Sequence, residues 1–168
     1  TMLNLGLVKI NGIDVNTHLH FALPRNFYLT AKAQYTYQTA IDVTDPNDTY
    51  YGDQIPYIPW HSGSAVGMFG WQNDWQQYGL NYSFIYVGER YNQQENIIYN
   101  YTQPWYTHDL SVFGEWQIKP LASSPHRLSP ITLRVALDIN NLLSQDYDVI
   151  INYPMPKRNF KCTVSITY

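Results

Sequence analysis

Residues 159–168 alternate strictly between apolar and polar side chains. Phe160, Cys162, Val164, Ile166 and Tyr168 hold every second position, and the residues between them are polar. Because the side chains of a β-strand point alternately to its two faces, this pattern predicts a strand with one apolar and one polar face. Such a strand belongs either to a soluble sheet or to a membrane barrel with its apolar face in lipid and its polar face toward a hydrated lumen.

Five further segments show the same period of two. Their expected bounds are 27–41, 62–72, 76–89, 106–118 and 131–140. Each has about 10 to 15 residues, which exceeds the usual strand of a globular sheet and is long enough to cross a bilayer at a tilt. Length and alternation together favour the membrane barrel.

The first segment, 3–21, is less regular. Ile13, Val15, Leu19 and Phe21 alternate with polar residues, but upstream Lys9 and Asn11 fall on the same face as these apolar side chains. The segment is either one long strand that projects beyond the bilayer or two short strands joined by a type I′ turn at Asn11-Gly12. We favour the single strand and keep the turn as the alternative.

The lengths of the links between these segments also follow a pattern. Links 22–26 and 73–75 are short, links 42–61, 90–104 and 143–157 are long, and link 119–130 is intermediate. Outer-membrane barrels alternate short periplasmic turns with long extracellular loops. A periplasmic C-terminus therefore places all three long links outside the cell, whereas a soluble sandwich has no reason to sort its links in this way.

Composition points in the same direction. Charged residues make up 14% of the chain, against roughly 25% in soluble domains, and aromatic residues make up 16%, including 16 tyrosines and five tryptophans. Tyr and Trp have an apolar body and a polar tip, which suits the boundary between membrane and water. The net charge of −3 and the scattered Lys and Arg argue against a nucleic-acid partner. A tyrosine-rich soluble all-β domain remains the alternative.

Several sequence strings occur in an order that is typical of one family. They are NLGLVKINGID at 4–14, QIPYIPWH at 54–61, YVGERY at 86–91, YTHDL at 106–110, NNLLSQDY at 140–147 and YPMPKRNF at 153–160, followed by the terminal strand. They are distributed along essentially the whole chain, and the chain resembles the C-terminal part of the barrel of TonB-dependent outer-membrane receptors. One departure is Lys157, because the family usually has Gly before the Arg.

The resemblance implies an all-β fold, a transmembrane antiparallel β-barrel segment with about seven long amphipathic strands of a barrel of about 22. Residues 1–168 would form the C-terminal barrel segment, and the plug domain would be absent from this chain. Seven strands leave two edges unpaired, which lipid does not tolerate, so the remaining barrel and plug are expected on the same protein or on another chain. The alternative is a self-contained eight-stranded barrel with an adhesion or structural role, which needs the Asn11-Gly12 turn.

The implied function is TonB-dependent import of a large scarce nutrient, such as an iron chelate, haem or cobalamin, across the Gram-negative outer membrane. The implied partners are TonB acting through the plug, outer-membrane lipid and, as a further candidate, a surface lipoprotein. No cofactor is expected. The terminal aromatic residues Phe160 and Tyr168 resemble the signal by which the outer-membrane assembly machinery recognises its clients.

Candidate ligand contacts are the aromatic residues of two long links. They are Tyr50, Tyr51, Tyr57 and Trp60 in the first and Tyr99, Tyr101 and Trp105 in the second. These side chains suit stacking on a ligand or partner, although an extracellular aromatic girdle is the favoured interpretation. Asp45, Asp48 and Asp53 carry the oxygen ligands that calcium prefers, but their spacing matches no compact calcium loop, so solvated carboxylates are favoured.

Neither a catalytic centre nor a metal site is predicted. The histidines His18, His20, His61, His108 and His126 are spread over different strands and links, and the single cysteine, Cys162, rules out an internal disulfide and a cysteine-based zinc cluster. Only His18 and His20 lie two apart on one strand face, and no acidic partner completes a site there. A polar lining of the lumen is the expected role of these two histidines.

Overall fold

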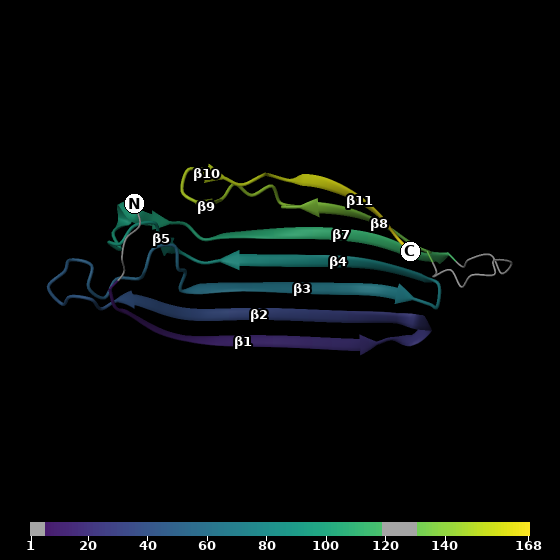
Figure 1. The fold of residues 1–168 in the computed structure, drawn as a ribbon, viewed down its shortest axis with the longest axis horizontal. Helices are drawn as coiled ribbons and strands as arrows, with labels where there is room; N and C mark the ends of the chain where they lie inside the picture. The colour runs from purple at the N-terminus through teal and green to yellow at the C-terminus, as the bar shows by residue number, and fades with distance from the viewer. Residues whose placement is uncertain (1–5, 119–130) are drawn as a thin grey trace.

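The computed structural model describes residues 6–118 and 131–168, and these residues form one large antiparallel sheet (Figure 1). Its seven strands run in the order β1-β2-β3-β4-β7-β8-β11. Their bounds are β1 Val8–Ala22, β2 Phe27–Asp42, β3 His61–Gln72, β4 Gln76–Val87, β7 Trp105–Ile118, β8 Ile131–Asn140 and β11 Asn159–Thr167. The prediction of an all-β chain with seven long strands is confirmed.

The predicted strand ends differ from the structure in two places. Strand β4 ends at Val87, two residues earlier than expected. The amide of Gly88 still donates to the carbonyl of His61 in the same register, and the chain leaves the ladder after this bond. Strand β1 begins at Val8, and the described residues Gly6 and Leu7 of the predicted segment lie outside it. The remaining ends agree within one residue, since the period of two continues to the last paired residue.

The first segment is a single strand, as favoured. Asn11 and Gly12 pair with Thr39 and Gln38 of β2, and neither has a positive φ. The alternative of a type I′ turn at this point is therefore wrong, and the eight-stranded barrel loses the hairpin on which it depended. Residues 3–5 of the predicted segment lie outside the described residues.

Strand register sorts side chains into two unlike faces. One transverse row crosses all seven strands through Leu19, Ala31, Gly67, Tyr82, Leu110, Ile139 and Phe160. The next row crosses the same strands through His20, Thr30, Met68, Asn81, Ser111, Asp138 and Lys161. The side chains of the first row are apolar or aromatic, whereas those of the second row are polar except for Met68.

The apolar face has no covering layer in the part of the chain that the structure describes. Most of its large side chains are exposed, and the only buried hydrophobic residues among those described are Ala40, Ile55 and Phe113. A soluble sandwich buries this face against a second sheet. An uncovered apolar face of this extent is the surface that an outer-membrane barrel turns toward lipid.

Aromatic side chains gather in two bands across the apolar face. Near the short turns, the ring of Tyr78 lies 5.9 Å from Trp71 and 5.8 Å from Trp116, whose indole nitrogen donates to the Tyr78 hydroxyl. Near the long loops, His61 lies 5.1 Å from the ring of Tyr37. Two such bands flanking an aliphatic zone are typical of the interfacial girdles of membrane barrels.

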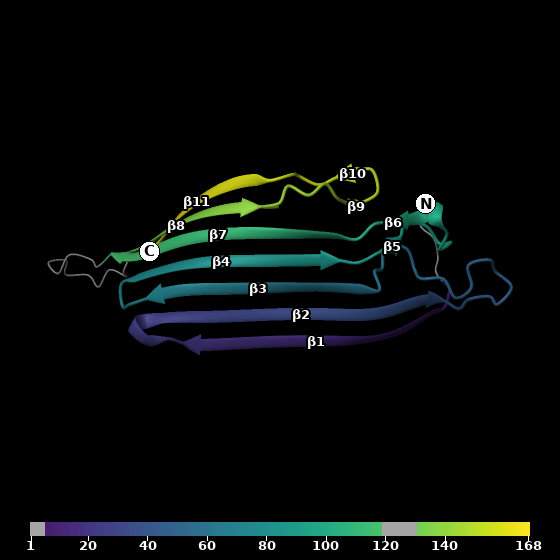
Figure 2. The same ribbon diagram turned by 180° about the vertical axis from the view of Figure 1, so that it is seen from behind.

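All long links lie at one end of the sheet. Figure 1 and Figure 2 show the turns before β2 and β4 at the same end as the C-terminus, and the loops before β3, β7 and β11 at the other end. The predicted sorting of link lengths is confirmed for these five links. Link 119–130 lies outside the described residues. The helices found in residues 6–118 and 131–168 are single turns, and none is of a length or hydropathy that spans a membrane.

A small apolar contact holds the polar face together near the turns. The ring of Phe113, which is 4% exposed, lies against Gly79 of the neighbouring strand, and the guanidinium carbon of Arg134 lies 4.0 Å over its centre. A Cβ atom at position 79 would clash with the Phe113 ring. Gly79 is therefore the residue that allows the ring to lie flat on the sheet.

We expect Gly79→Ala to lower the free energy of unfolding by about 1 to 3 kcal/mol, since the added methyl displaces the Phe113 ring. Gly67→Ala is the matched control because no atom lies within 4 Å of a Cβ there, and its effect is expected to stay within about 0.5 kcal/mol. The measurement is the urea midpoint of the detergent-solubilised protein. Equal midpoints for the two variants would contradict this packing.

Candidate functional site

Three long loops, 43–60, 88–104 and 141–158, gather beyond one end of the sheet. Two of them contain a small hairpin: β5 Arg90–Tyr91 pairs with β6 Tyr101–Thr102, and β9 Asp148–Ile150 pairs with β10 Tyr153–Pro154. Figure 2 shows both hairpins at the loop end of the sheet. The sequence patterns did not predict these hairpins, because pieces of two or three residues show no measurable period.

Loop 43–60 is fixed by a buried glutamine. Gln54 is 1% exposed, and its side-chain oxygen accepts a hydrogen bond of 2.8 Å from the amide of Ala40 at the end of β2. Its side-chain nitrogen donates to the carbonyl of Ile58. The loop also reaches its neighbour, since Tyr57 donates its amide hydrogen to the carbonyl of Tyr91 at 2.7 Å. Gln54 thus replaces the hydrophobic core that this loop lacks.

Two of the three carboxylates considered for calcium, those of Asp45 and Asp53, bond to the loop backbone. Asp45 accepts a hydrogen bond from the amide of Asn47, and Asp53 accepts one from the amide of Asn96 in loop 88–104. Within residues 6–118 and 131–168 no group of three or more His, Cys, Asp or Glu side chains converges on a metal-sized site. His126 lies outside the described residues. Asp53 therefore acts as a link between two loops.

A buried arginine joins loop 88–104 to loop 141–158. Arg90 is 2% exposed, and its Nη2 donates to the carbonyls of Asp148 at 2.9 Å and Val149 at 3.0 Å. Burial lowers the pKa of the guanidinium below its ordinary value. Arg90 also lines a cavity of about 370 Å³ with Tyr57, Val87, Trp105, Val149 and Ile150. Three segments that are distant in the sequence thus meet around this side chain.

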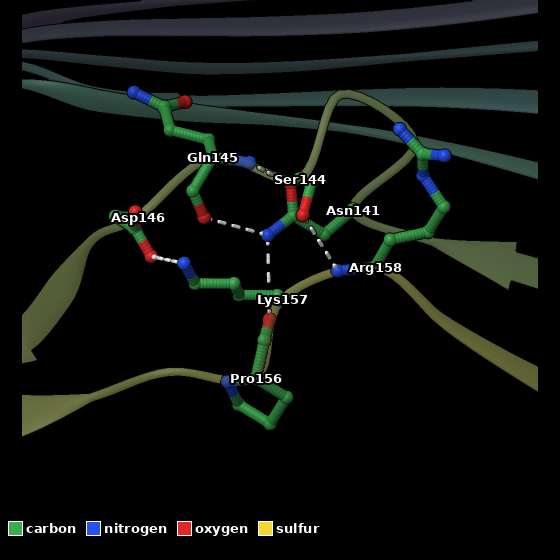
Figure 3. A network of polar contacts seen from close by, with 7 residues as sticks. All are labelled: Asn141, Ser144, Gln145, Asp146, Pro156, Lys157 and Arg158. Carbon is green, nitrogen blue, oxygen red and sulfur yellow. Dashed lines mark hydrogen bonds and ion pairs between the residues drawn. The ribbon is translucent and has the colours of Figure 1, made fainter.

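A third buried polar residue, Asn141, fixes the base of loop 141–158 (Figure 3). Its amide nitrogen donates to the carbonyls of Gln145 at 2.8 Å and Pro156 at 3.3 Å, and its side-chain oxygen accepts from the Gln145 amide at 2.9 Å. Its own backbone amide donates to Asp109 of β7, and its φ of 51° suits asparagine. The NNLLSQDY string therefore encodes a turn that closes both ends of the loop.

Lys157 stands where the resemblance leads us to expect glycine, and it is accommodated beside this turn. Its ammonium group pairs with the carboxylate of Asp146 at 3.0 Å across the mouth of the loop (Figure 3). Its backbone has no positive φ, so the position does not require glycine. The neighbouring Arg158 donates from Nε to the carbonyl of Leu142 at 2.9 Å.

Four of the seven predicted aromatic residues line the cavity beside Arg90 or pack against Tyr91 or Tyr147. Trp105 stacks on Tyr147 with ring centres 4.5 Å apart, and Tyr57 lines the cavity beside Arg90. Trp60 and Tyr101 both pack edge-on against Tyr91, at 5.7 and 6.1 Å. Burial and a hydrogen bond to Glu89 raise the pKa of the Tyr101 hydroxyl above its ordinary value.

The other three predicted residues lie apart from this cluster. Tyr99 is 89% exposed, and Tyr50 and Tyr51 lie in a turn of loop 43–60. The prediction missed Tyr91 and Tyr147, although both belong to strings that carry the family resemblance. The girdle described above consists of strand residues, and Trp105 shares the polar side of the sheet with Ser62 and Val87. For these seven residues, the girdle and the ligand contact both stay predictions.

Phe160 and Tyr168 lie near the two ends of the last strand, Phe160 next to loop 141–158 and Tyr168 at the C-terminus. Phe160 lies on the exposed apolar face, and Tyr168, which is 94% exposed, ends the chain beside the short turns (Figure 1). Cys162 is a free thiol on the same apolar face, opposite Leu137. This placement is consistent with a small apolar side chain at the lipid-facing surface.

Comparison with known proteins identifies one family. A family model described as TonB dependent receptor-like, beta-barrel matches residues 1–142. The match covers the first six long strands and ends just after β8. No curated protein matches the sequence.

We expect Asn141→Ala to lower the free energy of unfolding by about 2 to 3 kcal/mol, since it leaves buried backbone groups without partners. Asn152→Ala is the matched control: its φ of 65° imposes the same conformational cost, while the side chain of Asn152 is exposed. The measurements are the urea midpoint of the full-length receptor and the rate of proteolytic cleavage within loop 141–158. Cleavage at the same rate in both variants would show that the side-chain network does not fix the loop.

Proposed function

Because the chain belongs to the TonB-dependent receptor β-barrel family, we propose that it forms part of the wall and mouth of an active outer-membrane transporter for a large scarce nutrient, the class that includes iron chelates, haem and cobalamin. The family consists of receptors of the Gram-negative outer membrane that act with a plug and TonB. The observation that carries the proposal is the sheet with one bare apolar face, one polar face and all its long loops at one end.

The open edges of the sheet support a larger barrel. Among the described residues, β1 pairs only with β2, and β11 pairs only with β8. An unpaired edge inside lipid would leave a row of backbone amides and carbonyls without hydrogen bonds. The remaining barrel strands, and the plug on which TonB acts, therefore come from further residues of the same protein or from another chain.

The parts of this chain take separate roles in transport. The polar face lines the lumen beside the plug, and the apolar face contacts lipid. The loops lie at the cell surface and the C-terminus in the periplasm, where Phe160 and Tyr168 mark the last strand for the assembly machinery. Ligand contact falls to the loop aromatic residues, above all Tyr57, Trp60, Tyr101 and Trp105, and a surface lipoprotein would dock on the same loops. The eight-stranded alternative is not favoured, since Asn11 and Gly12 lie inside β1.

The orientation can be tested by cysteine labelling in a Cys162→Ser background of the full-length receptor. A membrane-impermeant maleimide is expected to label Tyr99→Cys in intact cells, because loop 88–104 faces the medium. The matched variant Asp74→Cys, exposed in the short turn before β4, is expected to react only after the outer membrane is permeabilised. Labelling in the opposite order would overturn the orientation.

Transport is tested by uptake of an iron-loaded chelate, haemin, cyanocobalamin and a fluorescent oligosaccharide into cells with and without the receptor. At least one probe is expected to accumulate only in the receptor-bearing cells, and its uptake should stop when TonB is removed or the proton gradient is collapsed. Equal uptake by both strains, or uptake that persists without TonB, would reject the proposal. Normal amounts of receptor in the outer membrane serve as the control.

A further inference from the structure

A groove runs between loops 88–104 and 141–158. The proposal for this groove rests on the transporter role in one respect, because its occupant would be the imported nutrient. The groove has a volume of about 380 Å³, within the range of small-molecule sites. The residues that matter for its chemistry are Tyr101, Gln103, Trp105, Gln145, Asp146 and Tyr147. We call it the interloop groove.

The floor of the interloop groove is aromatic. Trp105 and Tyr147 stack with ring centres 4.5 Å apart and an angle of 27° between the rings, and both side chains remain partly exposed. The electron-rich face of an aromatic ring attracts weakly positive C–H groups. A pyranose ring presents several such C–H groups on one flat face, so its shape and polarity both match this floor.

The rim of the interloop groove is polar and uncharged or acidic. Gln103 is exposed, and Gln145 projects away from the Asn141 turn, with its side-chain oxygen accepting from the Tyr106 amide (Figure 3). Asp146 is oriented by its ion pair with Lys157. Amides both donate and accept hydrogen bonds and carboxylates accept them, which is the set of partners that neighbouring sugar hydroxyls require.

The charge of the loops selects against anionic ligands. Among the described residues, no Lys or Arg lines the interloop groove, and the ammonium group of Lys157 is paired with Asp146 at its rim. Loops 43–60, 88–104 and 141–158 carry seven acidic and three basic side chains, a net charge of −4: Asp45, Asp48, Asp53, Glu89, Glu95, Asp146 and Asp148 against Arg90, Lys157 and Arg158. The field of such a surface repels an anionic iron chelate and leaves the binding of a neutral molecule unaffected.

We propose that the interloop groove binds a neutral saccharide, whose pyranose ring packs against an outer face or the edges of the stacked Trp105–Tyr147 pair while its hydroxyls bond to Gln103, Gln145 and Asp146. The aromatic floor, the amide and carboxylate rim and the absence of basic lining each fit a hydroxyl-rich neutral ligand. The transported nutrient is therefore a saccharide rather than a charged iron complex.

The test is a binding titration of the detergent-solubilised full-length receptor, followed by tryptophan fluorescence and calorimetry. The probes are maltohexaose, cellohexaose, xylohexaose and mannohexaose, with ferric citrate as the anionic comparison. At least one oligosaccharide is expected to bind. Trp105→Ala and Tyr147→Ala are each expected to weaken that binding about ten-fold. Gln103→Ala, which alters only an exposed side chain, is expected to weaken it several-fold and guards against misfolding of the aromatic variants.

The control variant is Ile98→Ala, which removes an exposed apolar side chain of the same loop that does not line the groove, and it is expected to bind as the unaltered receptor does. The proposal is overturned if no oligosaccharide binds, if Trp105→Ala and Gln103→Ala bind it unchanged, or if ferric citrate binds and is lost in Trp105→Ala. TonB-dependent uptake of an iron chelate without any sugar binding defeats this inference alone. Sugar binding without TonB-dependent uptake defeats the transporter role alone.

Discussion

Backbone hydrogen bonding is the constraint on which the rest of this structure depends. A sheet in lipid has no water to satisfy its amides and carbonyls, so each strand must be paired along its whole length inside the membrane. Strands β1 and β2 meet this requirement through an uninterrupted register from Val8 to Ala22. The same register assigns every side chain to lipid or lumen, because a slip of one residue would exchange the two faces. The pairing of the strands therefore also determines which face each side chain lies on.

Loops 43–60, 88–104 and 141–158 are held in place by different interactions. Few apolar side chains are buried there, and Gln54, Arg90 and Asn141 take their place as buried polar anchors. Each one satisfies backbone groups that the irregular loops leave unpaired, and Arg90 and Gln54 each join segments far apart in the sequence. Buried polar groups are costly without partners, so the bonds of Gln54, Asn141 and the Arg90 Nη2 favour one arrangement of the loops, although the Arg90 Nη1 is buried without a partner. A binding surface that is held in place before its ligand arrives loses less entropy on binding.

The sequence predicted the strands well because period-two alternation is a local pattern. The link lengths alone predicted which links lie at the same end of the sheet. The sequence was ambiguous at Asn11-Gly12, since this pair suits a turn as well as a strand, and the choice was made by pairing with Thr39 and Gln38 of another segment. It missed Tyr147 for the same reason. The Tyr147 ring meets Trp105 only because Asn141 fixes the base of loop 141–158 beside β7. No local pattern encodes a contact between residues so far apart in the sequence.

The position of Trp105 connects the three long loops to the lumen. It is the first residue of β7, and its register with Val87 and Ser62 places it on the polar side of the sheet. The aromatic floor of the interloop groove therefore continues into the face that lines the lumen, whereas the adjacent Tyr106 belongs to the lipid-facing band. Alternation along a single strand thus separates a side chain of the apolar face from the proposed ligand contact by one residue. In the proposed role, a molecule released from the groove would next pass Thr107 and Asp109, which follow Trp105 on the same side of β7.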